Sequence, residues 1–353
     1  MLIKGIYVRV TQTLLLLLFL TSAGYSQEKQ GSPVRILFYN AENLFDIHDD
    51  SLTADNDFLP QGVMRWTLSR YKRKISFLYK TIVAAGEWEP PAVAAFCEVE
   101  NRKVLEDLVY NTGLSNHNYG IVHEDSPDPR GIDVCLIYRR DIVKVLDYEY
   151  WVPDRKETEK FTSRSVLCAR CQVDGDTICL VVNHWPSRRG GVLAGESLRS
   201  EIAEMVRNKA DSLMRSQPRG SKIIIMGDFN ATPQDMVIQS LLKSSPDEGS
   251  GDHGFLVNLA EKLSVEGKGT YRYLGAWEMI DQIIVSENLL NGGYGLATLR
   301  DLFRIYSPEF LLRNDARYPG PSPFSTYRGY RYQGGYSDHL PVILDLFRVA
   351  KGP

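Results

Sequence analysis

Short runs of apolar and β-branched residues recur along the chain and predict β-strands that are buried on at least one face. These runs are residues 34–39, 92–96, 134–138, 178–182, 223–226, 282–285 and 342–346. Between them, apolar residues at helical spacing predict helices over 69–85 and 198–214. Because strands and helices mix from end to end, the pattern indicates a layered α/β or α+β fold.

The arrangement of these elements favours one domain, although 353 residues would be enough for two. No proline-rich or serine-rich linker divides the chain and no internal repeat is present, so we expect one domain over residues 32–350. The loosest loops surround residues 244–254 and 317–335. Inside the first predicted helix, the basic stretch 71–74 indicates a solvent-exposed helix face.

The first 26 residues have a different pattern from the rest of the chain. Lys4 and Arg9 precede an apolar run over 14–20, and small or polar residues follow over 21–26. This order is typical of a secretory signal peptide, and the run is shorter than the roughly 20 residues of a spanning helix. We therefore expect residues 1–26 to be removed. The mature protein is then exported, to the periplasm or the medium, without a transmembrane span.

Composition and charge narrow the class of protein only slightly. Hydrophobic residues make up 43% and charged residues 24%, which excludes a disordered chain and a multi-span membrane protein. The 41 basic and 44 acidic residues give a net charge of −3, which points neither toward nor away from nucleic acid. Any anionic ligand must therefore be met by a local group of cations.

The five cysteines are expected to be small buried residues, because each lies in an apolar run. They are Cys97, Cys135, Cys168, Cys171 and Cys179. The spacing of Cys168 and Cys171 matches half of a zinc or redox site, but no second pair or nearby histidine accompanies it. A disulfide after export stays open, although a domain of this size does not need one.

Polar side chains occur repeatedly where the predicted strands end. The residues that follow strands are Asn40, Glu42, Asn43, Glu98, Glu100, Asn101, Asn183, His184, Asp228 and Asn230, while Asp281, Asp338 and His339 precede strands. Such groups are costly to bury unless they meet solvent, a metal or one another. Turn capping, a solvated strand end or a histidine stacked on a neighbouring tryptophan would explain single members. The joint pattern favours convergence at one end of a sheet.

Asp338 and His339 set a further condition on this convergence. Neighbours in a strand point to opposite faces, so both reach one site only if they lie in a loop. Gly334 and Gly335 come shortly before them and make such a loop reasonable.

Six blocks, taken in this order, resemble the endonuclease/exonuclease/phosphatase superfamily. They are FYNAEN (38–43), FCEVEN (96–101), NHWPSR (183–188), MGDFN (226–230), IDQIIVS (280–286) and SDHLPV (337–342). The blocks span nearly the whole mature chain. The resemblance implies a DNase I-like four-layer fold, in which a two-sheet β-sandwich is flanked by helices. It also implies a phosphoric ester hydrolase that depends on a divalent metal.

The resemblance further implies the metal ligands. Glu98 would be the main ligand, with Asn40 and Asp338 assisting. These are hard oxygen donors, so the ion would be Mg²⁺ or Mn²⁺.

The remaining family positions imply how water and phosphate are handled. Asp228 would orient or deprotonate the attacking water, and Asn230 would hold the water and the phosphate. His339, polarised by Asp281, would stabilise the phosphoryl oxygens or act as an acid or base. His184 would contact the scissile phosphate from the other side.

Two arginines are candidates for further phosphate contacts. Arg130 precedes a predicted strand and resembles a phosphate-facing arginine of the nuclease members, while Arg188 follows His184 and could reach a second phosphate or an inositol-type headgroup. Each could equally be an ordinary loop arginine. The loop over 317–332 interleaves arginine and tyrosine, which suits stacked bases and phosphates or a loop held down by its own tyrosines.

The sequence thus predicts an exported, divalent-metal-dependent phosphodiesterase or nuclease-like hydrolase with water as the nucleophile. A phosphomonoesterase, or a hydrolase of a phospholipid headgroup such as sphingomyelin or an inositol type, is an alternative on the same site. The substrate is in each case a phosphate ester, with nucleic acid and phospholipid headgroups among the candidates. We expect a monomer. A catalytically idle protein that binds a phosphorylated ligand is the alternative from another class, and the six undamaged blocks disfavour it.

Overall fold

All seven predicted strands and both predicted helices are present in the computed structural model of the chain. It describes residues 33–87, 89–154, 161–188, 195–216, 221–241, 255–290 and 293–350. The expected signal peptide over 1–26 and the loop over 244–254 lie outside the described residues. Residues from Val34 onward form one compact unit.

None of the helices within the described residues is both long enough and apolar enough to cross a membrane.

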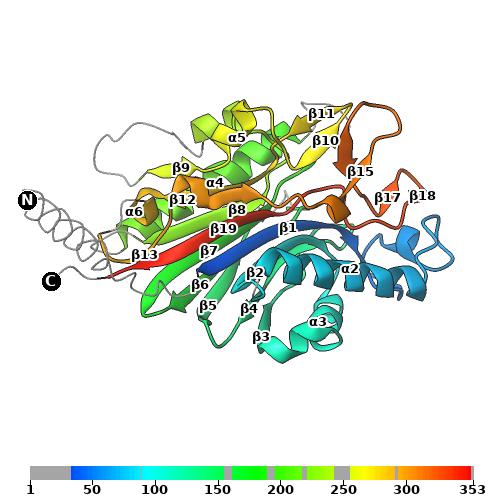
Figure 1. Cartoon of the computed structure of the whole chain (residues 1–353), viewed down its shortest axis with the longest axis horizontal. Coiled ribbons are helices and arrows are strands. Elements are labelled where there is room, and N and C mark those ends of the chain that lie inside the picture. Colours follow the sequence, from blue (N-terminus) through cyan, green and yellow to red (C-terminus); the bar gives the residue numbers. More distant parts are fainter. Residues whose placement is uncertain are drawn as a thin grey trace, which may run out of the picture. The chain divides into compact units, whose positions relative to one another are not determined.

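The first sheet has the strand order β13-β19-β1-β2-β4-β3, and β14 also pairs with β19 (Figure 1). The strands are β1 (Val34–Leu44), β2 (Val93–Val99), β3 (Tyr119–Val122), β4 (Asp133–Arg139), β13 (Gly295–Ala297), β14 (Phe303–Ile305) and β19 (Val342–Val349). Central strand β1 is parallel to β2 and antiparallel to β19. Asn40 on β1 is therefore level with Cys97 on β2, and the polar residues that follow both strands meet at one edge.

The second sheet has the order β5-β6-β7-β8-β12-β9. Its strands are β5 (Val143–Trp151), β6 (Val166–Val173), β7 (Asp176–His184), β8 (Lys222–Asp228), β9 (Leu256–Asn258) and β12 (Asp281–Ser286). Strands β7 and β8 are parallel, with His184 opposite Asp228, and antiparallel β12 places Asp281 opposite Asp228 from the other side. This register alone brings three candidate residues together.

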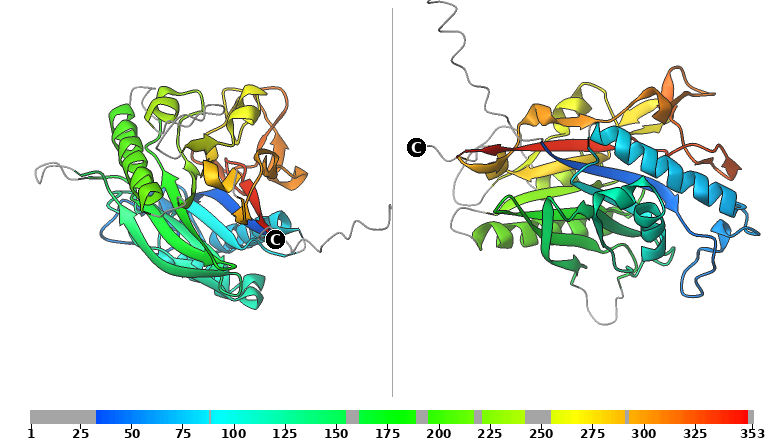
Figure 2. Two further views of the ribbon diagram at one scale, coloured as in Figure 1. Left: turned by 90° about the vertical axis from the view of Figure 1, so that its left-hand side faces the viewer. Right: turned by 60° about the horizontal axis from the view of Figure 1, so that its bottom comes forward.

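The two sheets face each other across an apolar core, and helices cover their outer faces (Figure 2). Along β1, Phe38 faces the inner core while Leu37 packs outward toward α2 (Leu68–Gly86) and α3 (Arg102–Tyr110). On the second sheet, Val181 packs outward against Val206 of α4 (Glu196–Arg215). The period-two alternation of the strands thus gives each sheet two buried faces. The predicted α/β fold, a two-sheet sandwich flanked by helices, is confirmed.

Short elements surround these layers. They include the helices α5 (Glu261–Val265) and α6 (Glu287–Leu290), the strand pairs β10 (Tyr271–Tyr273) with β11 (Ala276–Glu278), β15 (Leu312–Asn314) with β16 (Pro321–Pro323) and β17 (Tyr327–Arg328) with β18 (Arg331–Tyr332), and single helical turns at Asn56–Phe58, Gly113–His117, Val237–Leu241, Arg300–Leu302 and Glu309–Leu311.

The prediction that the basic stretch 71–74 faces solvent is wrong for Tyr71 and Lys74. Lys74 is only 1% exposed, because the helical period puts it on the inward face of α2 beside Ile75 and Leu78. Its ammonium group donates to the hydroxyl oxygen of Thr326 at 2.6 Å.

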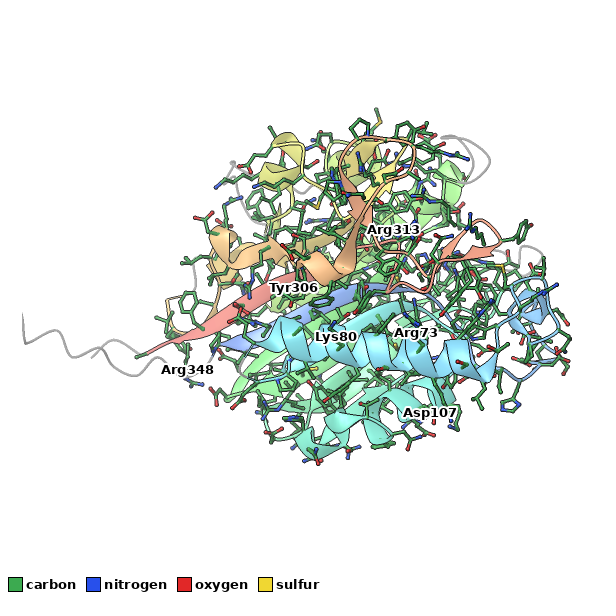
Figure 3. All side chains as sticks on the ribbon, turned by 45° about the vertical axis from the view of Figure 1, so that its right-hand side comes forward. Arg73, Lys80, Asp107, Tyr306, Arg313 and Arg348 are labelled. Atoms are coloured by element: carbon green, nitrogen blue, oxygen red, sulfur yellow. The ribbon has the colours of Figure 1, made fainter. Side chains whose placement is uncertain are left out.

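Cations on the solvent side of α2 lie over aromatic rings instead. Arg73 is 5.0 Å from the ring centre of Phe77, and Lys80 is 4.3 Å from that of Phe310 (Figure 3). All five cysteines are buried and free, as predicted for small apolar residues.

Candidate active site

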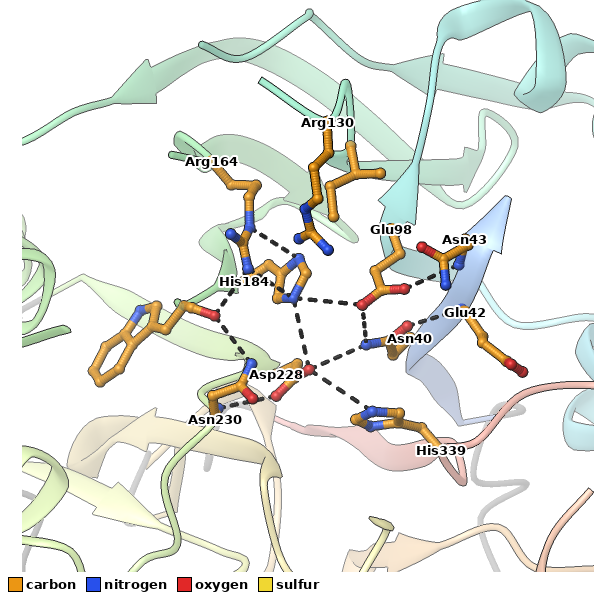
Figure 4. Close-up of polar contacts among 12 residues, drawn as sticks. Asn40, Glu42, Asn43, Glu98, Arg130, Arg164, His184, Asp228, Asn230 and His339 are labelled. Atoms are coloured by element: carbon orange, nitrogen blue, oxygen red, sulfur yellow. Dashed lines mark hydrogen bonds and ion pairs between the residues drawn. The ribbon is translucent and has the colours of Figure 1, made fainter. Parts of the chain in front are cut away.

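Asp228 ends β8 and lies at the centre of a buried polar cluster at one edge of both sheets (Figure 4). Its Oδ2 accepts a hydrogen bond from Asn40 Nδ2 at 3.1 Å and lies 3.8 Å from His184 Nε2 and 3.9 Å from His339 Nε2. Its Oδ1 accepts from the backbone N–H of Asn230 at 2.9 Å. Burial raises the pKa of Asp228 to about 7, although His339 opposes that shift. The carboxyl can therefore exchange a proton near neutral pH.

His339 and Asp281 form a hydrogen-bonded pair beside Asp228. His339 Nδ1 is 2.7 Å from Asp281 Oδ2, and the same carboxylate accepts a hydrogen bond from the hydroxyl of Thr270. Burial alone would lower the pKa of His339, but Asp281 and Asp228 raise it well above its usual value. The imidazole is therefore charged, and its Nε2 faces Asp228.

Asp338 and His339 lie in an irregular segment before β19, as their convergence requires. Gly334 has a φ of +71°, which favours glycine, and a side chain at Gly335 would collide with the backbone of the segment at Phe324. His339 Nε2 and Asp338 Oδ1 are 4.0 Å apart, so both neighbours face one site.

Glu98 is placed by a break in the regular strand pattern. The pairing of β2 with β4 shifts register between Cys97 and Val99, and Glu98 has a φ of +58°, which is uncommon for a side chain of this size. Its Oε2 accepts from the backbone N–H of Asn43 at 2.9 Å, and its Oε1 lies 3.8 Å from His184 Nε2. The irregular backbone is therefore used to aim a carboxylate into the cluster.

Asn40 joins the two halves of the cluster. Its Nδ2 donates to Asp228 at 3.1 Å and lies 3.4 Å from Glu98 Oε1, while its Oδ1 accepts from the backbone N–H of Glu42 at 2.9 Å. The amide nitrogen, and not the oxygen, thus faces the two carboxylates. In this arrangement Asn40 orients both carboxylates by donating hydrogen bonds.

Glu98 and Asp338 are the two cluster carboxylates with the most access to solvent. Their side chains are 17% and 36% exposed, and both line a cavity of about 400 Å³. Asp228, His184 and His339 line the same cavity. Two accessible carboxylates are hard oxygen donors, so this chain's residues fit a Mg²⁺ or Mn²⁺ ion.

His184 lies against a buried arginine that the sequence interpretation missed. Arg164 Nε donates to His184 Nδ1 at 3.3 Å, and its Nη2 is 3.1 Å from His184 Nε2. Asp128 accepts from Arg164 Nη1 at 3.0 Å. Burial, together with the charges of Arg164 and Arg130, lowers the pKa of His184 well below its usual value. His184 is therefore neutral, in contrast to His339.

Arg164 can be recognised in the sequence as a polar residue that comes just before a strand. Arg164 comes just before β6, which is antiparallel to β7, so the start of β6 is level with the end of β7. Polar residues that precede an antiparallel strand therefore reach the same edge as those that follow its neighbour.

Arg130 and Arg188 both line the 400 Å³ cavity, but they are held differently. Arg130 has a 44% exposed side chain that extends toward the space between His184 and Glu98 (Figure 4). Arg188 Nε donates to the carbonyl of Asn230 at 2.7 Å, and its Nη2 pairs with a carboxylate oxygen of Asp235. Arg188 thus braces the loop that carries Asn230, while Arg130 has more freedom to meet a ligand.

Asn230 itself has a φ of +47° and turns its side chain toward the end of β7. Its Nδ2 donates to the carbonyl of Trp185 at 3.0 Å. The structure therefore brings every predicted site residue to one edge of the two sheets, with Arg188 and Asn230 at the rim of the cluster.

Two buried ionisable residues, Glu42 and Lys74, lie behind this cluster. Glu42 accepts from the backbone N–H groups of Thr326 and Tyr327, the latter at 2.9 Å. Burial and the nearby carboxylate of Asp338 raise the pKa of Glu42 to about 8, against the influence of Lys74. The sequence pattern identified Glu42 as a polar residue after a strand. It did not identify Lys74 as a buried residue.

Comparison with known proteins agrees with this geometry. The model of the endonuclease/exonuclease/phosphatase family matches residues 35–348. No curated protein matches in sequence.

Three solved structures share the fold. The human nocturnin catalytic domain with bound sulfate is 16% identical, with a TM-score of 0.52 over 90% of this chain and 95% of that one. D. rerio TDP2 with a single-strand DNA product is 14% identical, with a TM-score of 0.52 over 90% and 99%. A mannosyl-6-phosphatase from Bacteroides thetaiotaomicron is 15% identical, with a TM-score of 0.54 over 89% and 99%.

At these identities the structural neighbours show the fold, and the family match covers the six motif blocks. The chain therefore belongs to the endonuclease/exonuclease/phosphatase family of phosphoric ester hydrolases.

Proposed function

We propose that this protein is an exported, divalent-metal-dependent phosphodiesterase that uses water as its nucleophile. The observation that carries the proposal is that Asp228 Oδ2 lies within 4 Å of Nε2 of both charged His339 and neutral His184, at a cavity shared with Glu98 and Asp338. Such a cluster combines a proton acceptor, hydrogen-bond donors and hard metal ligands in one place.

Glu98 and Asp338 are the residues that would hold the ion. A bound Mg²⁺ or Mn²⁺ supplies positive charge to the phosphoryl oxygens. Asn40 and the backbone N–H of Asn43 fix the Glu98 carboxylate for this role through their hydrogen bonds.

Asp228 accepts the proton of the attacking water in this proposal. Its pKa, raised to about 7 by burial, places proton exchange near neutral pH, which suits a general base. Hydrogen bonds from Asn40 Nδ2 and the Asn230 backbone hold its two oxygens in fixed directions. The carboxylate therefore does not have to reorient when water arrives.

His339 and His184 act on the phosphate from opposite sides. His339 donates from Nε2 to a phosphoryl oxygen, while Asp281 keeps its ring charged. Arg164 holds His184 by the ring edge, and Arg130 extends into the same space and adds a second positive charge.

A diester is favoured over a monoester because the lining of the cavity combines two kinds of side chain. The carboxylates Glu98 and Asp338 line it together with Tyr271, Tyr273 and Ile280, which offer apolar contacts to a second ester substituent. A phosphomonoesterase is a second candidate, supported by the shared fold with the B. thetaiotaomicron mannosyl-6-phosphatase. The phosphate ester of a phospholipid headgroup is a further substrate that is compatible with the same site.

Hydrolysis of bis-p-nitrophenyl phosphate tests the central proposal. We expect turnover with Mg²⁺ or Mn²⁺, none in EDTA, and recovery when the metal is restored. Full activity in EDTA contradicts metal dependence. A panel of plasmid DNA, RNA, sphingomyelin and phosphomonoesters then identifies the substrate. Absence of hydrolysis across the metal-loaded panel favours an idle ligand-binding protein.

Export is tested separately by expressing the full chain in a bacterial host. The order of charged, apolar and small residues over 1–26 supports cleavage after this segment. Mass spectrometry of the mature protein should show its loss, and an intact N-terminus in the cytoplasm contradicts export.

A further inference from the structure

A second cavity, of about 630 Å³, adjoins the reaction cavity. Asn43, Arg130, Tyr271 and Asp338 line both of them. A group attached to a phosphate in the reaction cavity can therefore extend directly into the second cavity. Its volume is sufficient for a substituent much larger than a methyl group.

Aromatic rings form one wall of this second cavity. Phe45 and Phe58 stack at 4.4 Å between ring centres, and Tyr327 meets Phe58 edge to face at 6.2 Å. All three line the cavity, and buried Trp66 packs behind Phe58 at 6.3 Å. The wall is held in place by these mutual contacts, so it offers a preformed apolar surface.

An exposed tyrosine at the tip of a hairpin also lines this cavity. Tyr330 connects β17 to β18, lines the cavity and is 74% exposed. The base of this hairpin is held by packing of Tyr327 on Tyr332 at 5.3 Å. Tyrosines thus pin down the loop over 317–332, as one of the two sequence interpretations has it, and leave Tyr330 available to a ligand.

The charges of the second cavity do not favour another phosphate. Four carboxylates and three guanidinium groups line it: Glu42, Asp57, Asp315 and Asp338, against Arg130, Arg272 and Arg328. Arg328 pairs with Asp315 at 2.9 Å, and Arg272 donates to the carbonyl oxygens of Gly275 and Pro321. A site for a polyanion needs a surplus of available cations, which these lining residues do not provide.

We propose that the second cavity is a subsite for an uncharged aromatic ring carried by the substrate, with Tyr330 as its specificity-determining residue. The substrate is then an ester of a single phosphate whose substituent ends in a flat ring, as in a nucleoside or an aryl group. The inference rests on the proposed function, because that function places the phosphate in the reaction cavity.

Two phosphonates of equal charge test the subsite by calorimetric titration in Mg²⁺. Phenylphosphonate should bind at least tenfold more tightly than methylphosphonate, because only the phenyl ring can stack on the aromatic wall. Tyr330→Ala should reduce this ratio at least threefold. Tyr110→Ala is the matched control. Tyr110 is 49% exposed at the end of α3 and lines neither of the two cavities, so its loss should preserve the ratio.

Thymidine 5′-phosphate and deoxyribose 5-phosphate separate the two sources of the ring. A tenfold preference for thymidine 5′-phosphate, lost in Tyr330→Ala, assigns the ring to a nucleobase, and a preference confined to phenylphosphonate assigns it to an aryl group. A second phosphate, in thymidine 3′,5′-bisphosphate, should improve binding by less than twofold. A larger gain overturns the assignment of an uncharged occupant.

Equal affinity for phenylphosphonate and methylphosphonate overturns the proposal, as does a ratio that Tyr330→Ala leaves unchanged. Failure of both phosphonates to bind at millimolar concentration also overturns it. Phosphonates are not turned over, so the ring preference is measured independently of catalysis. A protein that shows the preference but hydrolyses no ester contradicts the proposed function alone.

Discussion

The two ends of strand β1 carry two charged clusters with different balances of charge. At its start, Arg35 donates two hydrogen bonds to Asp345, at 2.7 and 3.0 Å, and Arg304 reaches the same carboxylate at 2.8 Å. At its end, Asn40 lies among several carboxylates, with Asp228 only 3.1 Å from its amide nitrogen. The first cluster has two cations for two carboxylates, because Glu87 also lies 3.2 Å from Arg35 and 3.6 Å from Arg304, and we call it the matched end. In the second cluster, the unmatched end, carboxylates outnumber cations.

The pKa values show the consequence of this difference. Burial alone would raise the pKa of Asp345, but Arg35 and Arg304 lower it. Burial raises the pKa of Asp228 to about 7 and that of Glu42 to about 8 because their neighbours compensate less. A matched ion cluster stabilises the charged form in the fold, whereas unmatched carboxylates leave charge that a cation can neutralise. The first arrangement serves stability, and the second is suited to chemistry.

Removing a catalytic group from the unmatched end should have the largest effect, and this effect is on activity. Asp228→Asn and His339→Ala should each lower kcat about a thousandfold, or about 4 kcal/mol in barrier height, because each removes a proton-transfer or charge-stabilising group. Thermal unfolding of Asp228→Asn should be unchanged or slightly raised, since a costly buried charge is lost. Steady-state kinetics beside melting curves measure both. Wild-type turnover in either variant contradicts its role.

Removing a group from the matched end should have the reverse effect. Asp345→Asn leaves buried Arg35 and its neighbour Arg304 with only the largely exposed carboxylate of Glu87, so we expect the free energy of unfolding to fall by about 3 kcal/mol. kcat should stay within twofold of wild type. Urea unfolding measures the loss.

Asp147→Asn is the control for this prediction, because it breaks an ion pair with Arg170 in which both side chains are about half exposed. We expect no measurable change in stability from it. A similar loss in both variants would mean that burial of the Asp345 cluster is not what makes it stabilising.

The same comparison explains which parts of the molecule could be predicted from the sequence. Alternation of apolar residues predicts the central strands, and a polar residue after a strand, such as Asp228, predicts the site. Arg164 precedes its strand and shows its place only once the antiparallel pairing is known. The charge of Lys74 predicts an exposed side chain, whereas the helical spacing places it on the buried face of α2. Arg35 and Asp345 are 310 residues apart and belong to no motif, so only the folded sheet pairs them.

Binding of the metal should relieve the crowding of carboxylates at the unmatched end. At a Mg²⁺ concentration a hundredfold above its dissociation constant, the free energy of unfolding should rise by about 2.7 kcal/mol. Glu98→Gln removes a proposed ligand and should lose this increment, whereas Asp345→Asn should keep it. Thermal denaturation with and without Mg²⁺ measures the three shifts. An equal shift in Glu98→Gln and wild type would place the ion elsewhere.

The smallest effect should come from the pH dependence of the metal-free protein. With a pKa of about 8 in the fold and about 4.3 when unfolded, Glu42 keeps a proton in the native state that the unfolded chain releases. Stability therefore falls as pH rises between these values, by at most about 1.4 kcal/mol per pH unit. Asp345 makes the opposite contribution to the pH dependence of stability. Its pKa is lowered in the fold, so it adds stability above its unfolded-state pKa, and this stability is lost as pH falls through its folded-state pKa.

Glu42→Gln removes the first of these contributions and leaves the second. From pH 6.5 to 7.5 in EDTA, we expect its free energy of unfolding to gain about 1 kcal/mol relative to wild type. Only wild type has a carboxyl group at position 42 that is protonated in the fold and ionised in the unfolded chain, so only wild type loses this stability as pH rises. Asp228 and Asp345 titrate in both proteins and cancel in the difference. Urea unfolding at the two pH values gives the measurement. A constant difference between the proteins would mean that Glu42 titrates as an ordinary carboxyl, and the two ends of β1 would then differ less in charge balance than their geometry indicates.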